Sequence, residues 1–133
     1  MSIFRSPAFL RRVLLVDAAA CALMGAVLAA ASGTIAGWTA LPHSLLLVAG
    51  VALLPIAGFI GFVATRDQIS EPAVWLIVVG NGAWVVASIW LLVGAGLSPN
   101  ALGHVLVGGQ ALAVGVLAEL EFFGVRNLSA ATA

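Results

Sequence analysis

The segment RDQISEP, residues 66–72, is the only charged connector between the long apolar runs of this sequence. Two apolar runs flank it directly and two more follow further out, so that the four runs lie at about residues 10–32, 44–65, 73–96 and 101–124. Each run has roughly 20 residues or more, enough helix to cross a hydrocarbon core of ~30 Å at ~1.5 Å per residue. The pattern predicts an all-α integral membrane protein with a four-helix transmembrane bundle.

Composition supports a lipid environment over a water-facing surface. Of the 133 residues, 63% are hydrophobic and only 8% are charged, whereas about a quarter of a soluble domain is charged. We therefore expect one transmembrane domain over residues 1–133, with the lipid bilayer as its main partner. The formal net charge is zero, so nucleic acid is not an expected partner. The single cysteine excludes an internal disulfide and a cysteine zinc cluster.

The positions of the arginines predict the orientation. Arginines precede the first run, follow the second and follow the fourth, at Arg5, Arg11, Arg12, Arg66 and Arg126. The other two connectors carry no charged residue. By the positive-inside rule, both termini (N-in and C-in) and the loop at 66–72 are expected to be cytoplasmic. The absence of lysine, with abundant Ala, Gly and Val, suggests a bacterial protein of the cytoplasmic (inner) membrane.

The second and fourth runs resemble each other. Aligning LPHSLLLVAGVALLPIAGFIGF with LGHVLVGGQALAVGVLAELEFF matches His43 to His104 and Phe62 to Phe123. One interpretation is a duplicated helical hairpin, whose two copies would be related by an axis along the membrane normal. The alternative is chance, because helices rich in Ala, Leu and Val match easily.

Polar residues inside the apolar runs are the main candidates for a functional site. Asp17, Asn81 and Glu119 are expected at similar depth in the cytoplasmic half, where they would form an intramembrane polar cluster. Glu119 shares a stripe of small residues with Gly115, and such stripes favour close helix packing, so we expect it to face the bundle. A charge facing hydrocarbon would cost at least ~2.5–3.5 kcal/mol. The cluster is either a proton or ion site, or structural polar contact between helices.

Further residues have secondary roles in this interpretation. Gln110 and Glu121 share a helix face that would meet another subunit, while Arg11 and Arg12 are near enough to Asp17 to reach it or to extend to the headgroups. Small residues expected at helix contacts are Gly25, Gly58, Gly61, Gly108 and Gly115.

His43 and His104 begin the second and fourth runs at matching height. Two histidines so placed are candidate ligands for a metal or haem iron, although interfacial solvation is the simpler reading. No phosphate-binding loop, metalloprotease helix or nucleophile triad is visible. We therefore expect neither a cofactor nor an enzyme.

Three functions are compatible with these features. The first is an accessory or assembly subunit that binds other membrane subunits, or itself, through glycine stripes. The second is a small proton-coupled transporter or channel, as a homodimer, that uses the intramembrane carboxylates. The third is a haem or quinone redox subunit built on the two histidines.

Overall fold

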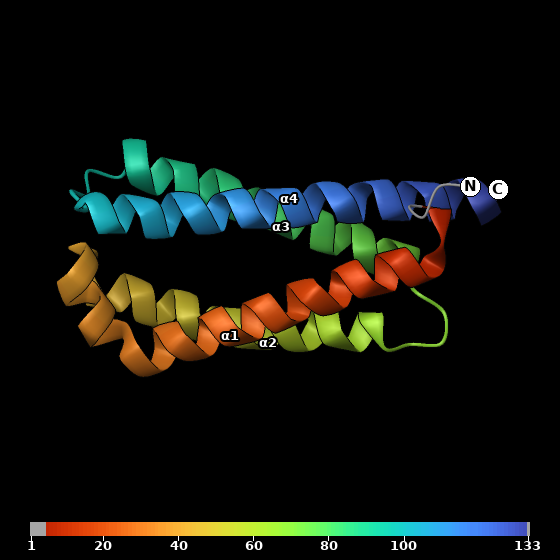
Figure 1. Cartoon of the computed structure of the whole chain (residues 1–133), viewed down its shortest axis with the longest axis horizontal. Coiled ribbons are helices and arrows are strands. Elements are labelled where there is room, and N and C mark those ends of the chain that lie inside the picture. The colour runs from red at the N-terminus through yellow and green to blue at the C-terminus, as the bar shows by residue number, and fades with distance from the viewer. Residues whose placement is uncertain (1–4, 133) are drawn as a thin grey trace.

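A computed structural model of the chain describes residues 5–132, and the regular structure in this range is entirely α-helical. The helices are α1 (Pro7–Thr39), α2 (His43–Ala64), α3 (Glu71–Val93) and α4 (Ala101–Thr132). Each helix is long and apolar enough to span a membrane. The start of α1, the end of α4 and the α2–α3 connector lie at one end of the molecule, which we call the terminal end, and the other two connectors lie at the distal end (Figure 1). The predicted four-helix architecture is confirmed to this extent.

Two helices are longer than the apolar runs predicted. Helix α1 continues to Thr39, beyond the expected end near residue 32, and has a kink at Ala31 (φ −121°, ψ 22°). An isolated glycine costs a helix only about 1 kcal/mol relative to alanine, so Gly33 and Gly37 do not end it. The helix ends at Thr39, shortly before Leu41 and Pro42, because a proline disfavours helical geometry in the residue that precedes it.

Helix α4 likewise continues beyond residue 124, the end that hydropathy predicted. Within its last turns, the Ser129 hydroxyl lies 2.5 Å from Glu71 Oε1, at the start of α3. This contact ties the C-terminal part of α4 to the neighbouring helix, although the segment is no longer apolar.

The helices pack as two hairpins, α1–α2 and α3–α4. The first hairpin is tightest where two glycines meet: a Cβ on Gly50 would lie 2.6 Å from the backbone nitrogen of Ala29, and a Cβ on Gly25 would lie 2.9 Å from the Gly50 oxygen. Only residues without a side chain permit this approach.

The two hairpins are joined along one side only. Helices α1 and α4 contact each other, whereas α2 and α3 hardly touch. Near the terminal end, Gly124 leaves room for Leu10, whose Cδ1 would lie 2.9 Å from an added Cβ. At the distal end, the Asn100 side chain donates to the Trp38 oxygen at 2.8 Å and accepts from the Gly103 N–H at 2.9 Å. The α1–α4 side is therefore closed, and the α2–α3 side is open.

Candidate functional site

Three buried polar side chains meet where α1, α3 and α4 approach one another. Asp17 is 1% exposed, Asn81 7% and Glu121 0%. The Asn81 amide nitrogen donates to Asp17 Oδ2 at 2.8 Å and to Glu121 Oε2 at 2.9 Å. This orientation of the amide is the chemically sensible one, because its oxygen would repel two carboxyl groups. One amide therefore bridges two acids that are 104 residues apart in the chain.

The rest of the environment does little to neutralise these acids. The Cys21 thiol lies 3.6 Å from Asp17 Oδ1, as a weak donor one turn further along α1. Glu121 Oε1 is buried and has no hydrogen-bond partner. Within residues 5–132, no arginine is hydrogen-bonded to either acid. The pair is thus held by one neutral amide and one thiol.

Chemistry favours a proton in this arrangement. Two negative charges that share one amide at a buried site repel each other strongly, and each lacks the solvation it would have outside. A single proton on the pair would remove one of the two charges.

The prediction that Glu119 faces the bundle is wrong. Glu119 is exposed, and Glu121 occupies the position expected for it. On a helix with about 100° per residue, Glu121 lies within about 40° of Val107, Val114 and Val125, whereas Glu119 lies about 120–140° away from them. Val107 and Val125 are in the core, so their stripe, and not the glycine stripe, marks the inner face of α4.

A second polar network lies further towards the distal end and contains no acid. The Trp84 indole N–H donates to Gln110 Oε1 at 2.8 Å, and Gln110 Nε2 lies 2.9 Å from Ser88 Oγ. Ser88 in turn donates to the Trp84 backbone oxygen at 2.8 Å. Gln110, expected on a face that meets another subunit, has its amide hydrogen-bonded within the chain. Sequence reasoning missed Ser88, although it follows Asn81 by seven residues on the same face of α3.

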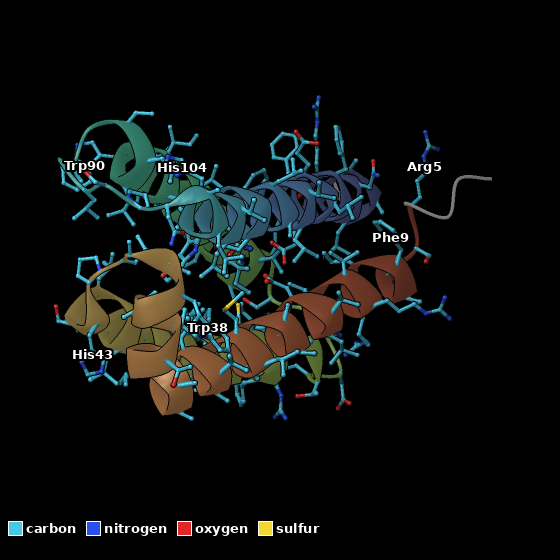
Figure 2. The ribbon with its side chains drawn as sticks, turned by 60° about the vertical axis from the view of Figure 1, so that its left-hand side comes forward. Arg5, Phe9, Trp38, His43, Trp90 and His104 are labelled. Atoms are coloured by element: carbon cyan, nitrogen blue, oxygen red, sulfur yellow. The ribbon has the colours of Figure 1, made fainter. Side chains whose placement is uncertain are left out.

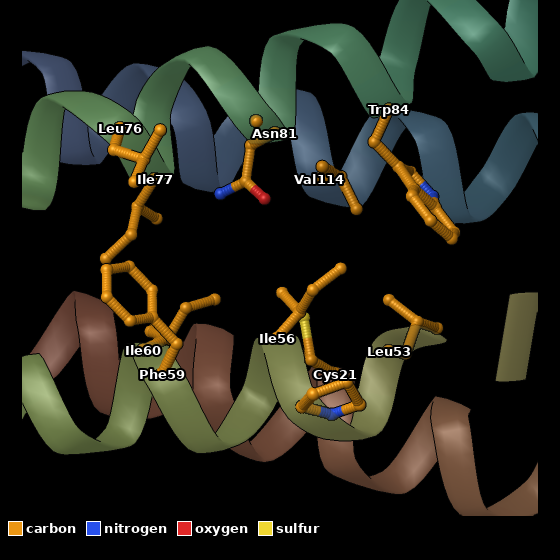
Figure 3. Close-up of a pocket in the computed structure, with 12 residues that line it drawn as sticks. Cys21, Leu53, Ile56, Phe59, Ile60, Leu76, Ile77, Asn81, Trp84 and Val114 are labelled. Atoms are coloured by element: carbon orange, nitrogen blue, oxygen red, sulfur yellow. The ribbon is translucent and has the colours of Figure 1, made fainter. Parts of the chain in front are cut away.

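A cavity of about 380 Å³ lies on the open side of the molecule, between the two hairpins. Figure 3 shows Asn81 from α3 and the Cys21 sulfur from α1 pointing into this space. Apolar side chains make up most of the remaining wall, including those of Ile56, Phe59 and Leu76. Trp84 lines this cavity and also a second one of about 280 Å³, which reaches Gln110 and Ser88. The first cavity therefore ends at the residues that hold Asp17.

The arginines expected near Asp17 have other positions. Arg11 donates to the backbone oxygens of Ala64, of Arg66 at 2.8 Å and of Asp67 at 3.3 Å. It thereby caps the C-terminus of α2, where carbonyls lack helical partners and a cation is favourable. Arg12 is exposed.

The two histidines do not form a common site. Figure 2 shows His43 and His104 on different hairpins. His43 Nε2 lies 2.9 Å from Ser32 Oγ, and His104 Nδ1 lies 3.0 Å from the backbone oxygen of Asn100. Across residues 5–132, no group of three or more His, Cys, Asp or Glu side chains is arranged to hold a metal.

The glycines expected at helix contacts divide into two groups. A Cβ on Gly25 would clash with α2, as predicted, but Gly58 has open space around it. At Gly61, Gly108 and Gly115 an added Cβ would make only ordinary contacts, at 3.8, 4.0 and 3.9 Å. Close approaches also occur at Gly50, Gly103 and Gly124.

No protein-family model matches this chain, and comparisons with curated proteins and with solved structures give no match either.

Proposed function

We propose that this protein is a small multi-pass protein of the bacterial cytoplasmic membrane that binds and moves protons at the Asp17–Glu121 pair, as a proton-coupled carrier does. The observation that carries the proposal is the shared amide: Asn81 bridges two fully buried carboxyl groups, and one carboxyl oxygen lacks any partner. Ionisable groups inside membrane helices are costly, and proton relays are a frequent reason for keeping them.

Membrane insertion and orientation belong to the same proposal. The outward faces of the helices carry exposed apolar side chains, such as Leu23 at 69%, Val79 at 66% and Leu112 at 71%, which acyl chains would cover. The start of α1, the end of α4 and the arginine-containing α2–α3 connector lie at the terminal end. The positive-inside rule then favours a cytoplasmic position for this end. The carboxyl pair lies between the Trp84–Gln110 network and this end.

The experiment is a proton-flux measurement on protein reconstituted into lipid vesicles that enclose a pH-sensitive dye. After a pH gradient is imposed, native protein is expected to collapse it faster than protein-free vesicles do. Asp17→Asn and Glu121→Gln are expected to slow this collapse about tenfold or more, since each removes half of the proton site.

Glu119→Gln is the matched control, because Glu119 is an exposed acid two residues from Glu121 on the same helix. This variant is expected to retain the native rate. If Asp17→Asn and Glu121→Gln both keep the native rate, or if native protein is no faster than empty vesicles, proton movement through this pair is wrong.

A second candidate function is that of an accessory subunit, and the open glycines favour it. Gly58 on α2 and Gly80 on α3 have nothing within 4 Å of an added Cβ, so both remain free for the close approach of another helix. Co-purification with a larger membrane complex, lost in Gly58→Leu or Gly80→Leu, would support this function. A stable monomer in mild detergent, with no partner after purification from native membranes, would count against it.

A further inference from the structure

Among the polar groups that line the cavity between α2 and α3, only hydrogen-bond acceptors remain available to a ligand. Both hydrogens of the Asn81 amide are used, one on Asp17 and one on Glu121. The Trp84 indole N–H is used on Gln110, and the Cys21 thiol points to Asp17. What remains among the lining residues is the Asn81 carbonyl oxygen, for which no described residue acts as donor, together with a weakly accepting sulfur.

This distribution selects a ligand that donates hydrogen bonds. A carboxylate, a ketone or a quinone would bring a further acceptor to a site that has no free donor, and it would be left unpaired at a cost. An amine brings N–H groups that match the Asn81 oxygen.

Charge narrows the choice further. Directly behind Asn81 and Cys21 lie two acids whose hydrogen bonds come only from these two neighbours, and Glu121 Oε1 is entirely without a partner. A cation in the cavity would be attracted to this pair, because a buried site of low dielectric strengthens the interaction between opposite charges. An anion would be repelled by it. The site is therefore electrostatically suited to an ammonium group.

The remaining wall determines the other part of the ligand. It consists of apolar side chains such as Ile56, Phe59 and Leu76, and it lies on the side where the two hairpins hardly touch. Phe59 and Leu76 are themselves 40% and 63% exposed on the outer surface. A volume of about 380 Å³ falls at the small end of the range for ligand pockets. An elongated hydrocarbon group could enter from the bilayer between α2 and α3.

We propose that this cavity binds a lipid-soluble amine in its ammonium form, with the hydrocarbon part between α2 and α3 and the nitrogen at the Asn81 oxygen. This inference rests on the proposed function in one respect: it names the class of substrate that a proton-coupled carrier with this site would exchange for its proton. Ammonium and proton compete for the carboxyl pair, so binding of the amine releases the proton shared by Asp17 and Glu121.

Cys21 provides the test, because it is the single cysteine of the chain and lines the cavity. Native protein is reconstituted in phosphatidylcholine vesicles, which contain no primary amine. The rate at which N-ethylmaleimide modifies Cys21 is then followed by intact mass, with and without octylamine. Octylamine is expected to protect the thiol in a saturable way, while octan-1-ol, its neutral counterpart of similar length, leaves the rate unchanged.

Variants connect this protection to the acids. In Glu121→Gln, half-maximal protection is expected to require about tenfold more octylamine, because one negative charge is removed from the pair behind Asn81. In Glu119→Gln, the concentration dependence is expected to match that of native protein. Equal protection by octan-1-ol, or protection unchanged in Glu121→Gln, would mean that the cavity accepts any apolar molecule and would overturn the proposal.

A second readout applies if the buried thiol does not react. A bromoalkylamine that enters the cavity is expected to quench the fluorescence of Trp84, and this part of the total quenching, over that of the other three tryptophans, is lost in Trp84→Phe. Absence of both protection and quenching overturns the proposal. The outcome is separable from that of the flux experiment: amine-specific protection without proton flux removes only the carrier function, and flux without amine specificity removes only this ligand class.

Discussion

The two polar networks of this bundle use similar residues but leave them in different states. The distal network, formed by Trp84, Ser88 and Gln110, contains only neutral groups, and each side chain has a partner. The cluster of Asp17, Asn81 and Glu121 contains two acids, has a single amide between them, and leaves one carboxyl oxygen without a partner. A network that serves only to hold helices together needs no acid. The difference supports the proposal that the acidic cluster binds protons.

Removal of the bridging amide is expected to have the largest effect on stability. Asn81→Leu leaves two buried carboxyl groups without their shared donor, at about 1–3 kcal/mol for each unsatisfied group, or about 2–6 kcal/mol in total. Gln110→Leu, the matched change in the distal network, leaves a half-buried indole N–H unpaired and is expected to cost about 1 kcal/mol. Denaturant-induced unfolding in detergent micelles measures both values. Equal losses in the two variants would remove the distinction between the networks.

Disturbing the close approach of α1 and α2 is expected to lower the free energy of unfolding by a somewhat smaller amount. Gly50→Ala places a Cβ 2.6 Å from the Ala29 backbone nitrogen, so the two helices must separate. Overpacking of this kind costs about 1–3 kcal/mol. Gly58→Ala, on the same helix but in open space, is expected to leave the unfolding midpoint unchanged. An unaltered midpoint in Gly50→Ala would show that the hairpins do not depend on this contact.

Replacing Glu121 with a residue of similar size but without charge separates function from stability. Glu121→Met removes a buried acid with an unpartnered oxygen, and apolar replacements of buried charged groups are often neutral or stabilising. We expect the free energy of unfolding to stay within about 1 kcal/mol of the native value, while proton flux is lost. A destabilisation as large as that of Asn81→Leu would instead assign Glu121 a structural role.

The smallest effect on proton flux in this series is expected for Trp84→Phe, which changes the boundary between the two cavities. The Gln110 oxygen loses its indole donor, at about 0.5–1.5 kcal/mol, and the acidic cluster keeps all its hydrogen bonds. Proton flux should therefore remain close to native. A flux reduced as strongly as in Glu121→Gln would mean that the two networks act as one.

The arrangement of four helices could be predicted because hydropathy and length are properties of each segment alone. The end of α1 was predicted less accurately, because glycines at 33 and 37 resemble helix breaks in the sequence. The helix nevertheless continues until the segment that leads into Pro42. Asp17 and Asn81 were predicted at one site because both are polar residues at similar depth in long apolar runs.

Glu121 was misjudged because two candidate inner faces of α4 compete in the sequence. The glycine stripe through Gly108 and Gly115 ends at Glu119, and the stripe through Val107 and Val125 contains Glu121. Which of the two stripes packs against the neighbouring helices depends on the side-chain volumes across the interface. The sequence of one helix does not reveal these volumes. The steps of three and four residues that connect Val107, Ala111, Val114, Ala118, Glu121 and Val125 were the available signal.

The infrared spectrum of the purified protein at neutral pH tests the shared proton most directly. Native protein is expected to show the C=O absorption of a protonated carboxyl group, which is lost in Asp17→Asn and in Glu121→Gln and is retained in Glu119→Gln. A native spectrum without this absorption, or one that persists unchanged in both Asp17→Asn and Glu121→Gln, would contradict a proton held between these two acids.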